Sequence, residues 1–178
     1  MKNKFEIRGD KVAIFLKRRD KSIIETIIDL DDLGNAQGLN GTWHAYWNND
    51  TRSFYAVATC LDKNKTVRLH RVILNTPDFL HVDHVSHDTL NNSRSNIRNV
   101  TRSENMQNRV VSRSTTSGFL GVTWNKRDRN WRAHMKLNGK SIHIGFFDEV
   151  ELAAEASRKA RIKYMPGYVD RGKVVETC

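Results

Sequence analysis

The sequence predicts a protein of the α+β class. We expect N-terminal antiparallel strands, a central strand–loop–helix segment, and a C-terminal three-stranded antiparallel sheet packed on one helix. Three observations support this prediction. Residues 4–30 and 43–59 hold short runs rich in β-branched and aromatic side chains. The stretch 80–109 is dense in His, Asp and Asn. After a small polar segment at 112–117, alternation resumes around Asn138-Gly139 and is followed by an alanine-rich helical pattern.

Composition limits the classes of protein that this chain can represent. Its 178 residues, 38% hydrophobic and 28% charged, suit one ordinary domain or two small ones. No apolar run approaches the roughly 18 residues of a membrane-spanning helix. The basic N-terminus is not followed by an apolar segment, which argues against a secretory signal. Only Cys60 and Cys178 are present, so we expect a reducing compartment, the cytoplasm of a bacterial or phage-infected cell.

The net charge of +10 is unevenly distributed along the chain. Residues 1–63 carry ten basic and nine acidic side chains, residues 64–113 carry eight and four, and residues 114–178 carry twelve and seven. The excess of positive charge therefore lies in the last two segments, which favours double-stranded DNA as the partner. The alternative is a generally basic soluble protein.

The N-terminal third is predicted to be mainly antiparallel sheet. A turn at Gly9-Asp10 divides the first apolar run, and Pro77 should end a short helix near Asn75 because it restricts the residue before it. The expected segments are strands within 5–16 and 22–30, a loop or short helix over 29–41, a hairpin of 43–47 with 54–59, and a strand entering a helix over 67–74.

The central stretch predicts a strand ending at His84, a polar loop over 86–96, and a helix that follows. Thr101-Arg102-Ser103-Glu104 has the pattern of a capping box, with Thr101 as N-cap and Glu104 at N3. This helix would place Asn105 in its first turns, with Asn108 and Arg109 on the same face. Strand, loop and helix can then converge four side chains on one point: Asp83, His84, Asn96 and Asn105.

These residue types suit the hydrolysis of a phosphodiester. A neutral imidazole with a pKa of about 6.5 is a suitable base for activating water. Asp83 and Asn105 offer the hard oxygen ligands that Mg²⁺ or Mn²⁺ prefers, and an amide such as Asn96 can orient a neighbouring histidine. One alternative is a purely structural histidine. Another is a zinc site of His81, His84 and His87, although a strand would place the first two on opposite faces.

The same residues carry a resemblance to a known family. Leu69-His70-Arg71, Val82-Asp83-His84, the segment 90–98 and the segment 101–108 resemble the HNH homing endonucleases of phages and introns. The resemblance covers roughly residues 64–110 and implies a ββα-metal nuclease core. It implies His84 as general base, Asp83 and Asn105 as metal ligands, and Asn96 as the orienting asparagine. Side chains expected to support them are His70, Arg71, Asn92 and Asn108.

One departure from the family pattern falls in the loop. Where the family often has Asp-Asn-Arg, this chain has Asn91-Asn92-Ser93-Arg94. The roles of Asn91 and Asn92 therefore do not follow from the resemblance.

The C-terminal part is predicted to form strands at 121–124, 131–137 and 140–147 and a helix capped by Asp148. The middle strand alternates, so that one face would hold Arg132, His134 and Lys136, with Arg127 and Arg129 at the preceding turn. Such a face can enter the major groove of DNA, or it can simply be solvated.

A second resemblance favours DNA binding by this face. Gly121-Val122, Asn130-Trp131-Arg132-Ala133, Gly139-Lys140 and Ile144-Gly145-Phe146-Phe147-Asp148 are similar to the plant APETALA-type (ethylene-response-factor) domain, over roughly residues 117–165. His134 and His143 replace residues that are often acidic or tryptophan there, so the base preference does not carry over. The resemblance implies groove contacts from Thr123, Asn125, Arg132, His134, Lys136, Ser141 and His143.

The sequence thus predicts a site-specific DNA endonuclease, of the homing type, acting as a monomer or homodimer. We expect a nuclease domain with its N-terminal β extension at 1–111, a linker at 112–117 and a DNA-binding domain at 118–169. The alternatives are a restriction endonuclease of the HNH class and a catalytically silent DNA-binding regulator.

Overall fold

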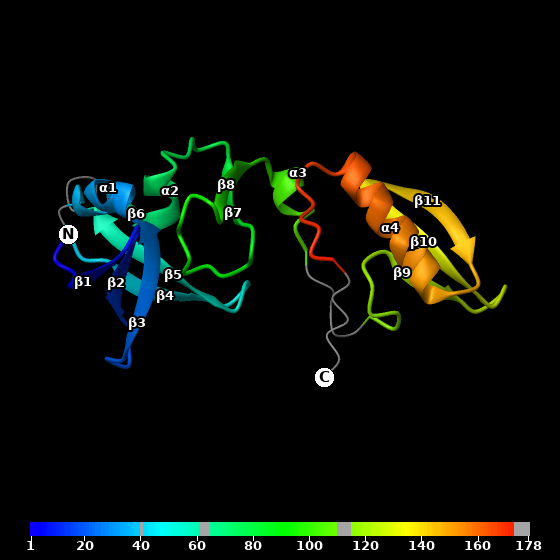
Figure 1. Ribbon diagram of the computed structural model, residues 1–178, viewed down its shortest axis with the longest axis horizontal. Helices are drawn as coiled ribbons and strands as arrows, with labels where there is room; N and C mark the ends of the chain where they lie inside the picture. Colours follow the sequence, from blue (N-terminus) through cyan, green and yellow to red (C-terminus); the bar gives the residue numbers. More distant parts are fainter. Residues whose placement is uncertain (40, 61–64, 110–114, 173–178) are drawn as a thin grey trace. The chain divides into compact units, whose positions relative to one another are not determined.

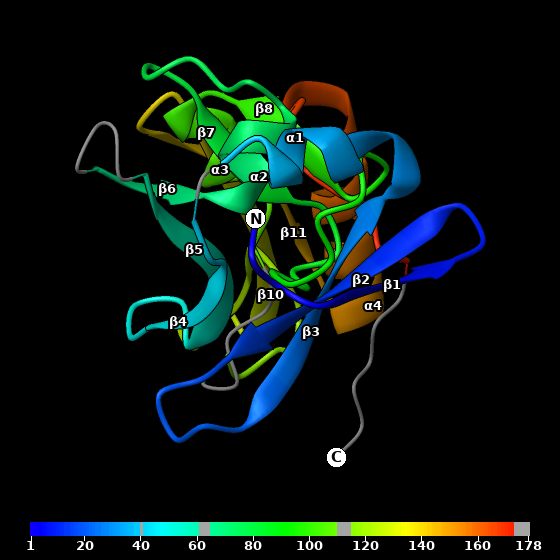
Figure 2. The same cartoon turned by 90° about the vertical axis from the view of Figure 1, so that its left-hand side faces the viewer.

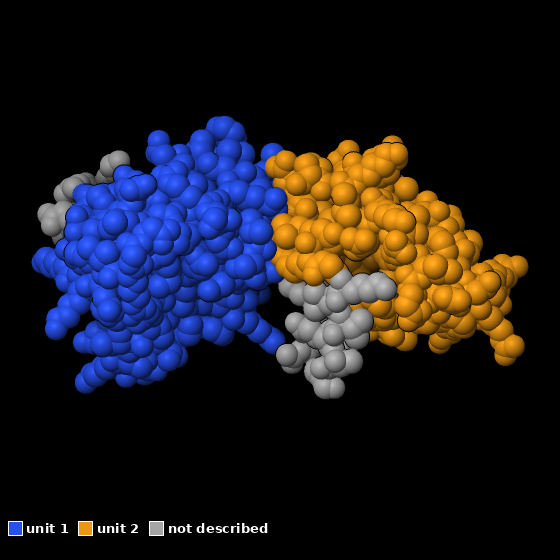
Figure 3. Space-filling model, viewed as in Figure 1, with its two compact units in different colours: residues 1–101 blue, residues 102–178 orange. Residues whose placement is uncertain are grey.

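The computed structural model describes residues 1–39, 41–60, 65–109 and 115–172. Strands dominate and helices are few, so the predicted α+β class is confirmed. The chain forms two compact units, residues 1–101 and 102–178, coloured separately in Figure 3. The predicted boundary at 111 and residues 112–114 of the predicted linker lie outside the described residues. None of the described helices is long and apolar enough to cross a membrane.

The first unit is built on a six-stranded sheet (Figures 1 and 2). The order is β1-β2-β4-β5-β6, and β3 pairs with β2. The turn at Gly9-Asp10 joins β1 to β2, and the predicted hairpin is β4 with β5, so both expectations are confirmed. The strands are β1 (Phe5–Arg8), β2 (Lys11–Lys17), β3 (Ile23–Asp29), β4 (His44–Asn48), β5 (Ser53–Cys60) and β6 (Lys65–Arg68).

The unit also contains three short helices, of which α1 and α2 contribute to its core: η1 (Leu30–Asp32), α1 (Leu33–Gln37) and α2 (Leu69–Ile73). Alternate residues of β2 point inward, and Ile14 and Leu16 are fully buried beside Trp43. The Trp43 indole N–H donates to the carbonyl of Ala36 at 3.0 Å, so the buried ring loses no hydrogen bond. The helix α2 ends before Pro77, as predicted.

A two-stranded sheet, β7 (His81–His84) with β8 (Ile97–Val100), packs on the same core. The loop between these strands runs along β3, where Ile27 forms a parallel bridge with Asn91. The backbone N–H of Asn92 donates to the carbonyl of Ile27 at 2.7 Å. The N-terminal sheet therefore holds the segment that the sequence marks as functional.

The second unit contains α3 (Arg102–Asn105), β9 (Val122–Asn125), β10 (Asn130–Leu137), β11 (Lys140–Phe147) and α4 (Val150–Tyr164). The strands form one antiparallel sheet of order β11-β10-β9, and α4 packs on it through a core of Val122, Ala133 and Ala153. This arrangement confirms the prediction. The N-cap of α4 is Glu149 rather than the predicted Asp148, and Glu149 forms no side-chain capping bond.

The helix α3 begins after Thr101 as predicted but ends at Asn105, so the expected extension to Arg109 was wrong. Its last turn tightens, because the Gln107 N–H donates to the carbonyl of Glu104 at 2.9 Å. The returning C-terminal segment also packs closely here. The Gly167 N–H donates to Gln107 Oε1 at 2.9 Å, and a Cβ at Gly167 would lie 2.3 Å from the Glu104 carbonyl oxygen.

Two glycines before β9 allow a matched test of the second unit. Gly118 and Gly121 both have positive φ, +71° and +70°, so alanine costs about 1–2 kcal/mol of backbone strain at either. At Gly121 the new Cβ would also lie 2.1 Å from the carbonyl oxygen of His134, whereas nothing lies within 4 Å at Gly118. Gly121→Ala should therefore destabilise the unit by about 1–3 kcal/mol more than Gly118→Ala. Urea denaturation measures the difference, and equal losses would contradict the close approach.

Candidate active site

His84 lies at the end of β7, where the strand enters the loop that joins it to β8. Its ring is buried, with 6% of the residue exposed. The ring atom Nε2 lies 3.1 Å from Oδ1 of Asn92. The structure places this histidine at the end of a strand beside a polar loop, as the sequence predicted.

A chain of buried hydrogen bonds determines the tautomer of His84. The Thr26 hydroxyl donates to the carbonyl of Leu90 at 2.7 Å, so its oxygen accepts from Asn92 Nδ2, also at 2.7 Å. The carbonyl oxygen of the Asn92 amide therefore faces His84. An oxygen only accepts, so Nε2 of the neutral ring carries the proton and donates. The lone pair of the neutral ring then lies on Nδ1.

Two aromatic side chains enclose this ring. The His84 centroid lies 5.1 Å from that of His70 and 6.1 Å from that of Tyr55, both in edge-on geometry. Burial, together with the smaller effect of nearby His84, lowers the pKa of His70 to about 3. Burial also lowers the pKa of His84, against the opposing effects of the Asn92 bond and the Asp83 charge. Both rings are therefore neutral near pH 7, as a general base must be.

Asp83 is buried beside His84 on the same strand. Its Oδ2 accepts from Arg98 at 2.8 and 3.0 Å, and Arg98 lies directly across the β7–β8 ladder. The sequence reasoning missed Arg98, because the opposite position in a hairpin depends on a register that a long loop does not fix. The arginine compensates the buried carboxylate charge and orients it.

Asn96 braces the loop instead of touching the imidazole. Its Oδ1 accepts from the Ser86 N–H at 2.9 Å, and its Nδ2 donates to the carbonyls of Asn91 at 2.7 Å and Asp88 at 3.2 Å. The hydrogen bond to the ring is made by Asn92, which was expected only as a supporting residue, and the role of Asn96 as the orienting asparagine stays a prediction. Asn96 influences His84 through the backbone, since its carbonyl accepts from the Val85 N–H at 2.7 Å.

Two arginines anchor the segments on either side of the site. Arg71 donates to the carbonyls of Leu80 and Pro77, each at 2.9 Å, and so fixes the turn that leads into β7. Arg94 donates to both carboxylate oxygens of buried Asp32 at 2.9 and 2.8 Å, which ties the loop to η1. A supporting role was predicted for Arg71, whereas Arg94 was missed.

Asn105 and Asn108 belong to the second unit. Asn105 is the last residue of α3 and is half-buried. The Asn108 amide is buried, and its Oδ1 accepts from Arg171 at 2.6 Å. The role of Asn105 as a metal ligand stays a prediction.

The described residues do not form a cluster of metal-binding side chains. Within the described part of the chain, no three or more His, Cys, Asp or Glu side chains gather into a group that could hold a metal ion. The zinc alternative of His81, His84 and His87 therefore lacks its ligand cluster. Magnesium typically takes one or two carboxylates and completes its shell with water and phosphate oxygens, so a single buried Asp83 is compatible with it.

The outer face of the C-terminal sheet gathers the predicted DNA-contacting residues. Pairing places Arg132 opposite Thr123 and Phe146, His134 opposite His143, and Lys136 opposite Ser141. Asn125 lies opposite Asn130 on the same face, while Arg127 and Arg129 lie in the turn before β10. All seven residues that the APETALA resemblance implied share this face: Thr123, Asn125, Arg132, His134, Lys136, Ser141 and His143.

Phe146 is a member of this face that the sequence reasoning missed. It is half exposed, and its ring lies 4.5 Å from the His143 ring. A bulge between Ala133 and His134 shifts the register, so the odd-numbered His143 and the even-numbered Phe146 both face outward. Strict alternation would place them on opposite faces.

The chain is similar to known proteins over the segment that contains this site. A family model described as HNH endonuclease matches residues 75–107. Protein 3.8 of Escherichia phage T7 is 31% identical over 85 residues, which cover 48% of this chain and 70% of the phage protein. An uncharacterised HNH endonuclease of Acanthamoeba polyphaga mimivirus is 33% identical over 110 residues, or 58% of this chain and 54% of the viral protein.

A different likeness concerns plant proteins. APETALA2-like protein 2 of Oryza sativa is 38% identical over 52 residues, which cover 29% of this chain but 12% of the plant protein. No solved structure shows significant similarity to the chain.

The matched segment contains the strand β7, the loop that follows it and the buried pair Asp83 and His84. These features define a nuclease domain of the HNH class. The similarity to the phage protein extends over most of that protein's length. The chain therefore contains an HNH endonuclease domain and is a relative of the phage protein.

The hydrogen-bond chain to His84 generates a prediction at a residue remote in sequence. Thr26→Val removes the hydroxyl that orients Asn92, so we expect DNA cleavage to slow by about 10-fold or more, part of the 10²–10⁴ that a positioned base supplies. Thr26→Ser keeps the hydroxyl and should cut at nearly the normal rate. Single-turnover cleavage at saturating DNA measures both variants. Equal rates for the valine and serine variants would show that the chain does not orient His84.

Proposed function

We propose that this protein is a site-specific DNA endonuclease of the homing type, in which His84 is the general base and a divalent metal ion takes part. The observation that carries the proposal is the Thr26–Asn92–His84 hydrogen-bond chain, which orients a buried neutral imidazole with its lone pair on Nδ1. The substrate is double-stranded DNA, and the place of action is the cytoplasm of the phage-infected or bacterial cell.

The side chains around His84 have distinct tasks in this proposal. Nδ1 takes a proton from the water that attacks the phosphorus atom. The Asn92 carbonyl oxygen accepts from Nε2 throughout, so it holds the ring in place and stabilises the positive charge that the ring gains. His70 cannot compete for this proton, since burial keeps its pKa at about 3. Its ring and that of Tyr55 restrict the orientation of the base.

Asp83 would hold the divalent cation, with Asn105 as the predicted second ligand. When bound, Mg²⁺ or Mn²⁺ supplies positive charge next to the scissile phosphate and the departing oxygen. Arg98 keeps the Asp83 carboxylate in one orientation through its two hydrogen bonds.

His84→Ala tests the general base. We expect cleavage to fall by at least 10²-fold, because proton transfer to a positioned side chain supplies about 10²–10⁴. DNA affinity should stay within about twofold, since the ring acts on water. His81→Ala is the matched control on the same strand, because His81 is exposed and should be dispensable for cleavage. Plasmid cleavage and filter binding give the two readouts, and near-normal cutting by His84→Ala would remove the assignment.

The metal requirement is tested in the same assay. A chelator should stop cleavage, and Mg²⁺ or Mn²⁺ should restore it. Asp83→Asn keeps the shape of the side chain but removes its charge, so it should raise the metal concentration needed. Full activity in a chelator would exclude a metal ion from the reaction.

We also propose that the outer face of the C-terminal sheet positions the nuclease on DNA. Its support is the gathering of Arg132, His134, Lys136 and Phe146 on one exposed surface, opposite the face that packs on α4. Arginine and lysine contact guanine edges and phosphates, and a two-stranded ribbon fits the major groove. A reading module separate from the cutting module suits the long targets of a homing enzyme more than the short ones of a restriction enzyme.

Charge reversal on this face should weaken binding. Arg132→Glu with Lys136→Glu is expected to raise the Kd for target DNA at least 10-fold and to make its salt dependence shallower by about one unit per lost phosphate contact. The matched control reverses Lys159 and Lys163, which lie on α4. If both double variants lose affinity equally, only net charge matters and the face does not read DNA.

A further inference from the structure

The charges of the N-terminal sheet are segregated, although residues 1–63 are almost neutral in sum. The turn between β2 and β3 and its flanks hold Lys17, Arg18, Arg19 and Lys21 against one acid, Asp20. The acids of the same outer face are already bound elsewhere.

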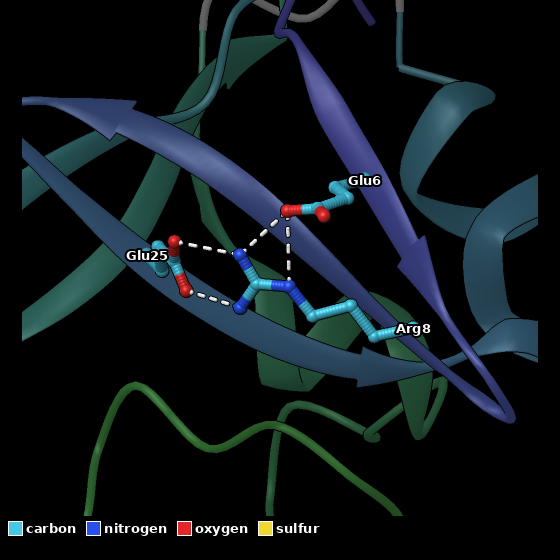
Figure 4. Close-up of polar contacts among 3 residues, drawn as sticks. All are labelled: Glu6, Arg8 and Glu25. Carbon is cyan, nitrogen blue, oxygen red and sulfur yellow. Dashed lines mark hydrogen bonds and ion pairs between the residues drawn. The ribbon is translucent and has the colours of Figure 1, made fainter.

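Figure 4 shows how the carboxylates of this face are engaged. Glu6 and Glu25 both bind Arg8, at 2.6 and 2.7 Å, and Asp29 binds Lys11. Glu6 and Glu25 share Arg8, and Asp29 pairs with Lys11, so these three carboxylates are engaged by cations outside the basic turn. The turn therefore presents a local positive charge that the composition of the segment conceals.

A concavity of 370 Å³ opens beside this turn, lined by Lys4, Phe15, Lys17, Lys21 and Ile23. Phe15 and Lys17 point outward, because Ile14 and Leu16 between and beside them are buried in the core. Lys17 pairs with Ile23 in the β2–β3 register. The carbonyl of Lys4 accepts from the Phe15 N–H at 3.0 Å, which brings a third lysine to the rim.

Lys21 is held at this rim by an uncommon backbone conformation. Its φ is +69°, in the left-handed region that favours glycine. Two backbone bonds close the turn: Arg18 N–H to the Ser22 carbonyl at 2.8 Å, and Lys21 N–H to the Arg18 carbonyl at 3.1 Å. Glycine would adopt this backbone conformation with less strain, so the presence of lysine indicates that its side chain has a function.

The three ammonium groups around the concavity lack partners in the described part of the chain. No hydrogen bond or ion pair joins Lys4, Lys17 or Lys21 to another described side chain. The floor between them is apolar, formed by Phe15 and by Ile23, which is 65% exposed. A ligand that pairs with these ammonium groups and also covers the apolar floor must carry both negative charge and apolar surface. The phosphates and deoxyriboses of a DNA strand provide that combination.

Aromatic groups extend this surface. The guanidinium of Arg18 lies 4.6 Å above the ring of Phe54, whose centroid is 4.8 Å from that of Trp47. Trp47 is 44% exposed. Cations interleaved with exposed aromatic rings are typical of surfaces that bind nucleic acid.

We propose that this lysine concavity, formed by Lys4, Phe15, Lys17, Lys21 and Ile23, docks the sugar–phosphate backbone of the DNA substrate. The inference rests on the proposed function for the identity of the substrate. The strand β3 connects the two sites within one unit: Ile23 lines the concavity, and Thr26 holds Asn92 against His84. DNA that fills the concavity is thus bound by the same rigid sheet that orients the base.

The test removes two lysines and measures affinity separately from cleavage. Lys17→Ala with Lys21→Ala is compared with Lys159→Ala with Lys163→Ala on α4, which changes the net charge equally. Binding is measured in a chelator over a range of salt concentrations. We expect the first pair to weaken binding at least 10-fold and to make the slope of log Kd against log salt shallower by about two units, since each contact contributes about 0.9. The second pair should leave the slope unchanged.

The outcomes separate this inference from the proposed function. Cleavage by the wild-type protein together with an unchanged slope in the Lys17/Lys21 variant would overturn the docking site alone. A changed slope in a protein that never cuts DNA would overturn the nuclease proposal alone. Polyglutamate serves as a competitor that resembles an acidic protein. If it displaces DNA no better than inorganic phosphate does, DNA is the ligand of the concavity. If these lysines bind polyglutamate but not DNA, the partner is an acidic protein and the proposal is wrong.

A second measurement avoids any effect of the substitutions on folding. Acetylation of lysines in the wild-type protein, read by mass spectrometry, should be slowed at Lys17 and Lys21 when DNA is added. Lys159 serves as the internal control. Equal acetylation of Lys17 and Lys21 with and without DNA would contradict the proposal.

Discussion

The candidate site depends on one buried polar connection, the bonds that join Thr26, Asn92 and His84. Thr26 is fully buried and Asn92 is 1% exposed, so water does not replace a lost partner. Leaving one such group unsatisfied costs about 1–3 kcal/mol, which strongly favours a single arrangement of the three side chains. The state of the histidine ring follows from that arrangement, because a hydroxyl committed to Leu90 determines which way the amide of Asn92 points.

This dependence changes the role of the N-terminal sheet. The sequence predicted this sheet only as a β extension of the nuclease domain. In the structure, β3 supplies Thr26 and bonds to the loop backbone, while Asp32 binds Arg94 from the same loop. The loop between β7 and β8 has no helix or strand of its own. Its conformation depends on the bonds that Asn96 makes within it and on the contacts with β3 and η1. The β7–β8 hairpin and the sheet therefore form one structural unit.

Local patterns in the sequence were sufficient for most elements. Alternation over 131–137 and the Asn138-Gly139 turn predicted the C-terminal hairpin, and Asp83 with His84 was placed correctly at a strand end. Long-range contacts were not predictable in this way. Asn92 and Thr26 are 66 positions apart, so nothing local distinguished Asn92 from Asn96 as the partner of the histidine. The length of α3 was wrong for the same reason, since residues near Gly167 pack where further turns were expected.

The bulge in the C-terminal sheet has a consequence for how this protein can diverge. On a regular strand, one alternation assigns every residue of β11 either to the core or to the exterior. Here the alternation restarts at the bulge. Odd-numbered residues face outward in the segment with Ser141 and His143, whereas even-numbered residues face outward in the segment with Phe146. Substitutions on one side can alter the exterior without imposing a matching change in core packing on the other. A single irregular residue thus divides the strand into two surfaces that evolution can vary independently.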